Sequence, residues 1–352
     1  MLADSVGAWV ARESPVTAFR RVRDAADPLG FDPAAWRSIA AMGWAGIAIS
    51  EDQGGAGLGL AAAGLIVAGL GRALVASPLA ATIAASAAIL HGGDEAQRRL
   101  WLPSIAEGTA IASIACDEGG HHDPARLRTK AERVASGWRL SGVKPFVAEG
   151  SAATLFVVAA DTGLFLVPAD TQGLAREPRS MMDSRGHASV SLDVTLPADA
   201  RLSDADLDTV LDGVRALAAA EMLGLADAVF AMTLDYLRVR VQFGRTIGSF
   251  QALQHRAATL FTRIELVRSC VAAALAALDA RADDSRSLVS LAKAQAGDML
   301  NLVTREAVQM HGGIGMTDEH DVGLYLKRAK MLEGAGGTSA FHRDRYARLN
   351  GY

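Results

Sequence analysis

Cysteine is scarce in this chain of 352 residues, and the two that occur, Cys116 and Cys270, lie far apart without a C-x-x-C spacing. This pattern excludes a disulfide framework and a cysteine-based zinc site, and it predicts a reducing, cytoplasmic compartment. His121 and His122 are adjacent, but no third ligand stands at a helical or hairpin spacing. A polar turn is therefore a better interpretation of this pair than a metal site.

Aromatic residues are also few, at 5%, while apolar residues make up 50% of the chain. This composition is typical of a globular, alanine-rich helical protein. The net charge of −4 argues against a general attraction to nucleic acid. The apolar stretch 58–90 is interrupted by Arg72 and Pro78, so it predicts buried helices and no membrane span. Residues 1–14 carry acids and lack an apolar core, which argues against a secretory signal.

Helical and β-type patterns occupy different parts of the chain. Residues 16–113 have helical periodicity, and an acid-capped helix is expected from Asp94 to Leu102. Short β-prone runs follow, including one that turns at Gly142, and helical periodicity returns at Leu207. The expected strands lie at 138–144, 154–160, 164–167 and 189–194, and the expected long helices at 214–241, 250–281 and 288–310.

The order of these patterns predicts three domains. The first is a helical N-terminal domain at 1–113, and the second is a β domain at 114–200. The third is a helical bundle at 201–352, because long helices joined by short loops pack antiparallel.

Two glycine-containing motifs stand at the ends of the predicted bundle helices. Residues 240–245 read Arg-Val-Gln-Phe-Gly-Arg and are followed by Ser-Phe-Gln at 249–251. An arginine there offers a planar, permanent charge suited to a pyrophosphate, although an ordinary helix-ending arginine is an equal alternative. Residues 309–317 read Gln-Met-His-Gly-Gly-Ile-Gly-Met-Thr. The glycines allow close approach of a backbone to a flat or phosphorylated ligand, but for this motif on its own a glycine-rich helix cap is the better explanation.

Taken together, these motifs resemble those of the acyl-CoA dehydrogenase family. The family's R-x-x-F-G loop with F-Q after it, its Q-x-x-G-G-x-G turn and its terminal G-T-S loop occur here in order, the last at 337–339. Residues 50–59, Ser-Glu-Asp-Gln-Gly-Gly-Ala-Gly-Leu-Gly, match an N-terminal glycine-rich loop of the family. The resemblance covers nearly the whole chain. It implies a mainly α fold with a central β domain: a helical N-terminal domain, a β-barrel-like middle and a C-terminal four-helix bundle.

The resemblance also implies FAD as cofactor, lying across an interface between subunits. Arg240 and Phe243 match residues at the pyrophosphate and adenosine half of the neighbouring subunit's FAD. Asp212 and Arg215 match residues that line the coenzyme A channel of the substrate. The other positions that match FAD contacts are Gln251, Gln309, Gly312, Gly313, Thr338, Phe146 and Ala148.

The resemblance fails at the catalytic base. Removal of the weakly acidic α-proton of a thioester needs a positioned carboxylate. In most members this Glu directly precedes G-T-S, where the present chain has Gly336. Other members carry it on a bundle helix, where this chain has Val214. Glu333, one helical turn earlier, is the remaining candidate, and a solvated loop acid is the competing interpretation.

The residues that would face the isoalloxazine depart from the family as well. The family's aromatic-x-Thr segment is here Phe146-Val147-Ala148, which lacks the hydroxyl. Its Thr-Glu-Pro is here Cys116-Asp117-Glu118, and a nearby Ser is His122. Elements for the adenosine half of FAD are thus retained, while those for the flavin half are changed.

Three functions follow from this mixture. One is α,β-dehydrogenation of an acyl-CoA, in fatty acid or steroid side-chain β-oxidation, with electrons passed to an electron-transferring flavoprotein. Another is a partner subunit that completes the FAD site of a homologous catalytic chain in a heteromer. A third is other flavin chemistry, such as nitroalkane oxidation or oxygen-dependent hydroxylation, although Asp212 and Arg215 favour a CoA channel. The assembly is expected to be a homo-oligomer or a heteromer.

Overall fold

The computed structural model describes residues 1–352 and divides the chain into two compact units, each of which is described by itself. The sheet unit contains residues 18–63 and 76–217, and the bundle unit contains residues 1–17, 64–75 and 218–352. The predicted domain boundaries follow changes of secondary structure along the chain and stay a prediction.

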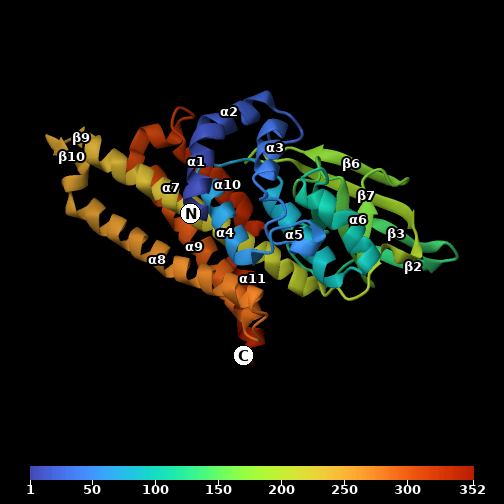
Figure 1. The fold of residues 1–352 in the computed structure, drawn as a ribbon. Helices are drawn as coiled ribbons and strands as arrows, with labels where there is room; N and C mark the ends of the chain where they lie inside the picture. The colour runs from blue at the N-terminus through green and yellow to red at the C-terminus, as the bar shows by residue number, and fades with distance from the viewer. The chain divides into compact units, whose positions relative to one another are not determined.

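Helices precede the first strand, as the periodicity of this region predicts (Figure 1). The expected helix after Asp94 is confirmed and continues to Ala106. Asp94 Oδ1 accepts from the Gln97 amide at 2.8 Å, and Gln97 Oε1 accepts from the Asp94 amide at 2.9 Å, which caps the helix reciprocally. The helices are α1 (Leu2–Glu13), α2 (Val16–Ala25), α3 (Pro33–Ala41), η1 (Glu51–Gln53), α4 (Gly59–Gly71), α5 (Leu79–Gly92) and α6 (Glu95–Ala106).

The middle of the chain forms two four-stranded sheets, with strand orders β1-β4-β5-β8 and β2-β3-β7-β6. The expected turn at Gly142 is wrong, because β3 pairs continuously across it with β7. Glycine is needed there for space, since a Cβ at this position would lie 2.5 Å from Thr129 Oγ1. The strands are β1 (Ala112–Ala115), β2 (Lys130–Val134), β3 (Gly137–Val147), β4 (Leu155–Ala160), β5 (Gly163–Pro168), β6 (Leu174–Arg179), β7 (His187–Leu196) and β8 (Arg201–Leu202).

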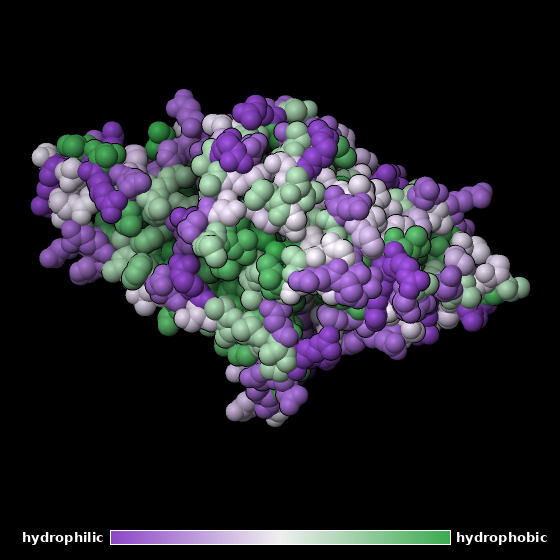
Figure 2. Space-filling model, viewed as in Figure 1, coloured by the Kyte–Doolittle hydropathy of each residue, from purple (hydrophilic) through white to green (hydrophobic).

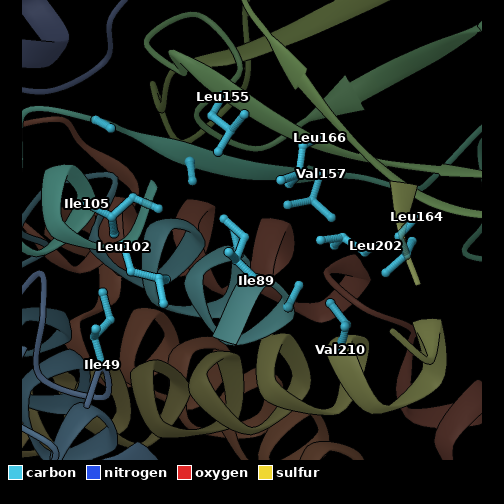
Figure 3. Packing of buried hydrophobic residues seen from close by; sticks show 14 of the residues in the cluster. Ile49, Ile89, Leu102, Ile105, Leu155, Val157, Leu164, Leu166, Leu202 and Val210 are labelled. Carbon is cyan, nitrogen blue, oxygen red and sulfur yellow. The ribbon is translucent and has the colours of Figure 1, made fainter. Parts of the chain in front are cut away.

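One hydrophobic core of the sheet unit lies between the first sheet and helices α5 and α6 (Figure 3). Most of its side chains come from α5, α6, the first sheet and the start of α7 (Leu207–Val239), and Ile49 joins them from the loop before η1. The residues labelled in Figure 3 are fully buried or nearly so, and they are Ile49, Ile89, Leu102, Ile105, Leu155, Val157, Leu164, Leu166, Leu202 and Val210. The opposite faces of β4 and β5 are buried in a second core, which includes Phe156, Val158 and Phe165. Because both faces are buried, these strands are apolar along nearly their whole length.

The bundle unit contains the greater part of α7 together with α8 (Gln251–Asp279), α9 (Ser285–His311), α10 (Val322–Gly334) and α11 (Ser339–Leu349). The three long helices expected from the sequence are confirmed. Arg328 of α10 donates two hydrogen bonds to Glu221 of α7, at 2.7 and 2.8 Å, and both side chains are largely buried. Helix α4 approaches the same site closely, because a Cβ at Gly71 would lie 2.9 Å from the Glu221 carbonyl oxygen.

Helix α7 alone is long and apolar enough to cross a membrane by length and composition. Two thirds of its most apolar window (67%) is buried within the protein. That burial is what a core helix of a globular bundle shows, and the interruptions at Arg72 and Pro78 divide the other apolar stretch between α4 and α5.

Candidate functional site

A β-hairpin with a two-residue turn lies between α7 and α8 and carries Phe243 at its tip. Strands β9 (Val241–Gln242) and β10 (Arg245–Thr246) pair antiparallel, and Figure 1 shows them at the end of both helices. Phe243 and Gly244 have φ values of +55° and +78°, which is the pattern of a type I′ turn. The Phe243 side chain is 91% exposed, and Figure 2 shows hydrophobic atoms at this end of the molecule. The hairpin therefore presents an unburied ring on a defined backbone.

The residues next to this tip stack on one another. The Arg245 guanidinium lies 4.1 Å from the ring centroid of Phe250, and Phe250 meets Phe243 edge-on at 6.1 Å. Arg240 directly follows α7, is exposed and makes no ion pair within the chain. Gln251 is the first residue of α8 and is exposed. Three of the predicted FAD contacts thus lie on one accessible loop.

The glycine turn at the end of α9 is open. Gly312 has φ +65° and begins a short helix, η4 (Gly312–Met316). A Cβ at Gly312 or Gly313 would meet no atom within 4 Å, so these glycines are not required by packing within the chain. Gln309, Gly312 and Gly313 are all exposed. This surface leaves room for a ligand to approach the backbone closely.

The terminal loop places no carboxylate at the expected base position. Gly336 is buried with φ +65°, and Glu333 lies in the last turn of α10. Glu333 Oε2 pairs with Lys330 Nζ at 3.1 Å, one turn earlier on the same helix. Thr338 is exposed and caps α11 by accepting from the Phe341 amide. The loop offers a backbone and a hydroxyl where the resemblance noted in the sequence leads us to expect an acid.

A buried lysine that the sequence analysis did not anticipate fixes this terminal loop. Lys293 of α9 is 1% exposed, and its Nζ donates to the carbonyl oxygens of Leu332, Glu333 and Gly337 at 3.1, 3.3 and 2.9 Å. His342 Nε2 lies 3.0 Å from the Gly336 carbonyl oxygen. The only sequence signal was an isolated lysine in an otherwise apolar helix segment. The loop conformation is therefore held from inside the bundle unit.

In the sheet unit, Phe146 and Ala148 lie at the end of β3 and are exposed. Ala148 contributes a carbonyl oxygen, which accepts from Ser113 Oγ at 2.6 Å. Its methyl side chain cannot donate a hydrogen bond. Val214, the second position expected for a base, is half-buried against the core of the sheet unit.

Arg215 lies at the centre of a buried ionic network. It is fully buried, and its Nη1 donates to Asp208 at 2.7 Å and to Asp212 at 2.9 Å. Its Nη2 lies 3.2 Å from His122 Nε2, and His122 Nδ1 lies 2.7 Å from Asp117 Oδ1. Since arginine only donates, His122 accepts at Nε2 and donates from Nδ1. The two predicted CoA-channel residues, Asp212 and Arg215, are thus engaged within the protein in this arrangement.

A second buried pair lies beside this network. Lys144 Nζ donates to Glu118 Oε1 at 2.7 Å and to the carbonyl oxygens of Cys116 and Ala159, and the lysine side chain is fully buried. Burial opposes the charge of Glu118, but hydrogen bonds from Lys144 and Thr129 outweigh it and lower the pKa of Glu118 to about 2. Burial and the nearby Asp117 raise the pKa of the Cys116 thiol to about 12. Cys116 is accordingly a packing residue with no thiolate at neutral pH.

Replacing Glu118 by Gln is expected to destabilise the protein by about 3–5 kcal/mol at pH 7, because it leaves the Lys144 ammonium buried without its counterion. The depressed pKa of Glu118 means that its contribution is complete above pH 4.5 and is lost as pH falls towards 2. The difference in free energy of unfolding between the wild type and Glu118→Gln, measured in urea, should therefore shrink as pH falls over this range. Asp193→Asn is the control, because the exposed Arg139–Asp193 pair should contribute about 1 kcal/mol or less. An equal loss in both variants would contradict the prediction.

Two family models match the chain. The acyl-CoA dehydrogenase N-terminal domain matches residues 1–109, and the acyl-CoA dehydrogenase C-terminal domain matches residues 206–349. The acyl-CoA dehydrogenase IpdE2 of Mycolicibacterium smegmatis is 35% identical over 333 residues, which cover 94% of this chain and 91% of the relative.

Solved structures agree with these matches. The Tcur3481-Tcur3483 steroid ACAD G363A variant has a TM-score of 0.93 and 32% identity, over 99% of this chain and 96% of the other. The ChsE4-ChsE5 complex of Mycobacterium tuberculosis has a TM-score of 0.86 and 27% identity, over 100% and 98%. The predicted fold class is confirmed, and FAD is the cofactor of such proteins. This chain belongs to the acyl-CoA dehydrogenase family.

Proposed function

We propose that this chain serves α,β-dehydrogenation of an acyl-CoA as the subunit that completes a FAD site on a homologous, catalytic partner chain. The observation that carries the proposal is the terminal loop. It has Gly336 where a base is expected, and Glu333 is engaged with Lys330. The partner would supply the flavin face and the carboxylate that removes the α-proton. In such an assembly FAD, when bound, accepts a hydride from the thioester's Cβ.

The residues of the bundle unit fit the pyrophosphate and adenosine half of FAD. Arg240 has a guanidinium without an internal counterion, which suits a diphosphate. Gly312 and Gly313 leave space for close approach of a ligand to the backbone. Phe243 offers an exposed ring that a cofactor or a partner surface would cover. We assign Gln251, Gln309 and Thr338, which are also exposed, to the same role.

The residues of the sheet unit do not fit the flavin half. Ala148 lacks the hydroxyl that the family motif would aim at the ring. His122 is directed inward, to Asp117 and Arg215, instead of presenting a small donor as serine would. Asp212 and Arg215 bind each other and Asp208, so a CoA channel in this chain would first have to break a buried network. We therefore derive no chemical step on this chain's own flavin face.

The relatives suggest the class of assembly and substrate. Two of the solved relatives are the Tcur3481-Tcur3483 steroid ACAD and the ChsE4-ChsE5 complex. We accordingly propose a heteromer that acts on a bulky, steroid-type side-chain thioester in the cytoplasm and passes electrons to an electron-transferring flavoprotein.

An autonomous dehydrogenase is the second candidate, because Glu333 places one carboxylate within the terminal loop region. To remove the α-proton of the substrate, Glu333 would have to leave Lys330 and turn towards the substrate. Under this alternative, Glu333→Gln abolishes turnover. Under the proposed function, the same variant leaves the turnover of the assembled protein unchanged.

The FAD-to-chain ratio tests the proposed function. The chain purified alone is expected to hold far less than one FAD per chain and to show no bleaching of flavin absorbance by acyl-CoA. Co-expression with a homologous acyl-CoA dehydrogenase chain that carries Glu before its G-T-S should yield a stable, yellow complex that acyl-CoA bleaches. One FAD per chain together with acyl-CoA-dependent bleaching in the isolated protein would refute the proposal.

A further inference from the structure

Three aromatic rings of the bundle unit join the two loops to which we assign FAD binding. His311 is the last residue of α9, and it is 2% exposed. Its ring centroid lies 4.6 Å from that of Tyr236 and 4.3 Å from that of His320. Tyr236 and His320 meet edge-on at 6.4 Å. These three residues are called the ring cluster below.

Hydrogen bonds define the protonation state of the ring cluster. His311 Nδ1 lies 2.7 Å from the Ala307 carbonyl oxygen, so this nitrogen carries the proton and donates it. His311 Nε2 is buried and has no hydrogen-bond partner. His320 Nδ1 accepts from the Val322 amide at 3.2 Å, so that nitrogen is unprotonated. Both imidazoles are therefore neutral in this arrangement.

The ring cluster is directly continuous with both loops. The Tyr236 carbonyl oxygen accepts from the Arg240 amide at 2.9 Å, and His311 immediately precedes Gly312. Gly315 packs against His311, because a Cβ at Gly315 would lie 3.1 Å from the His311 Cβ. A displacement of the stacked rings would consequently move Arg240 relative to the glycine turn.

A proton on His311 would disrupt the stack. Burial lowers the pKa of His311, the hydrogen bond to Ala307 opposes this shift, and the neighbouring His320 adds to the lowering. The titratable groups that face His311 are Tyr236 on α7 and His320 in the loop before α10, and its own helix contributes the Ala307 carbonyl. A charged ring would bury a second N–H without an acceptor, beside another imidazole.

We infer that the ring cluster is a positioning device that keeps Arg240 and the Gly312–Gly313 turn in a fixed spatial relation, and that this relation requires neutral imidazoles. The consequence for FAD rests on the proposed function. Because the folded-state pKa of His311 is depressed, its contribution to stability is complete above the ordinary value of 6.5 and decreases as pH falls below it. Both loops should therefore loosen, and FAD binding weaken, on the acid side of neutrality.

Amide hydrogen exchange of residues 312–316 in the isolated chain tests this inference without a cofactor. Between pH 7.5 and 5.5, after correction for the intrinsic pH dependence of exchange, protection of the wild-type turn is expected to fall, because protonation of His311 opposes the folded arrangement. His311→Leu keeps a buried apolar side chain that cannot be protonated, and it should show no such fall. Unchanged protection in the wild type, or an equal fall in His311→Leu, would overturn the inference.

His320→Phe is the second variant, because residue 320 is only half-buried and the substitution keeps a ring in the stack. It should retain the fall in protection but move its midpoint to higher pH, since no second imidazole then opposes the charge on His311. An unshifted midpoint would contradict the inference that the ring cluster requires both imidazoles to be neutral. One FAD per chain together with acyl-CoA-dependent bleaching in the isolated wild type would instead refute the proposed function and leave the exchange result standing.

Discussion

Replacing Arg240 by Ala is expected to weaken FAD binding by the co-expressed complex roughly 10- to 150-fold, the loss that follows from removing a charge-assisted hydrogen bond of about 1.5–3 kcal/mol. Arg240 lies at the end of α7, and no carboxylate of its own chain satisfies its guanidinium. The fold does not depend on this side chain, so the unfolding midpoint of the isolated variant should equal that of the wild type. Equilibrium titration of the deflavinated complex with FAD measures the effect.

Arg238→Ala is the matched control for this experiment. Arg238 lies two residues earlier, in the last turn of α7, is 70% exposed in its side chain, and pairs with Asp235 at 2.8 Å. Its removal changes net charge by the same amount but takes away only an exposed ion pair, which contributes little. Equal losses of FAD affinity in the two variants would show that Arg240 acts through the general charge of this surface and would contradict a direct contact with the pyrophosphate.

Helix positions and strand positions were predictable because burial imposes a period on each of them. Helices α8 and α9 and the strands at Leu155–Ala160 and Gly163–Pro168 lie within a few residues of the expected ranges, whereas α7 begins at Leu207 instead of at residue 214. Gly142 was misread as a turn, since a glycine required by the close approach of Thr129 leaves the same sequence signal as one required by a bend. The sequence pattern alone does not show whether a glycine is needed because there is no room for a side chain or because the backbone bends.

The predicted FAD contacts stay predictions, and the structure shows only that those of the bundle unit are exposed. The exposed loops at Arg240, Phe243 and Gly312 carry motifs that can be recognised from their spacing in the sequence, without knowledge of tertiary contacts. Arg215 was expected to face a substrate, but its burial depends on two carboxylates and an imidazole that come together only in the folded sheet unit. Spacing shows Asp212 beside it and gives no sign of His122, which lies 93 residues away in the sequence.

Phe243→Asn is expected to separate the stability of the isolated chain from the assembly of the complex. Phe243 occupies a left-handed conformation, φ +55°, that costs a side chain other than Gly or Asn about 1 kcal/mol. Asn-Gly is the preferred sequence for this turn type, so the isolated variant should unfold at the same or a slightly higher urea concentration. Loss of the 91%-exposed ring should nonetheless weaken association with the partner, by about 2–4 kcal/mol if the ring is an interface anchor, or roughly 30- to 1,000-fold.

Phe243→Tyr distinguishes the ring from the backbone in this experiment. Tyrosine keeps the aromatic surface and the same unfavourable φ, so both the stability of the isolated chain and the affinity for the partner should match the wild type. A strained backbone at an exposed tip is retained when the residue has a function that outweighs the strain. An aromatic ring that binds outside its own chain would be such a function. If Phe243→Asn left complex formation and FAD retention intact, the hairpin would not be a contact surface. The proposal that two chains share one FAD would then lose the support of this exposed ring.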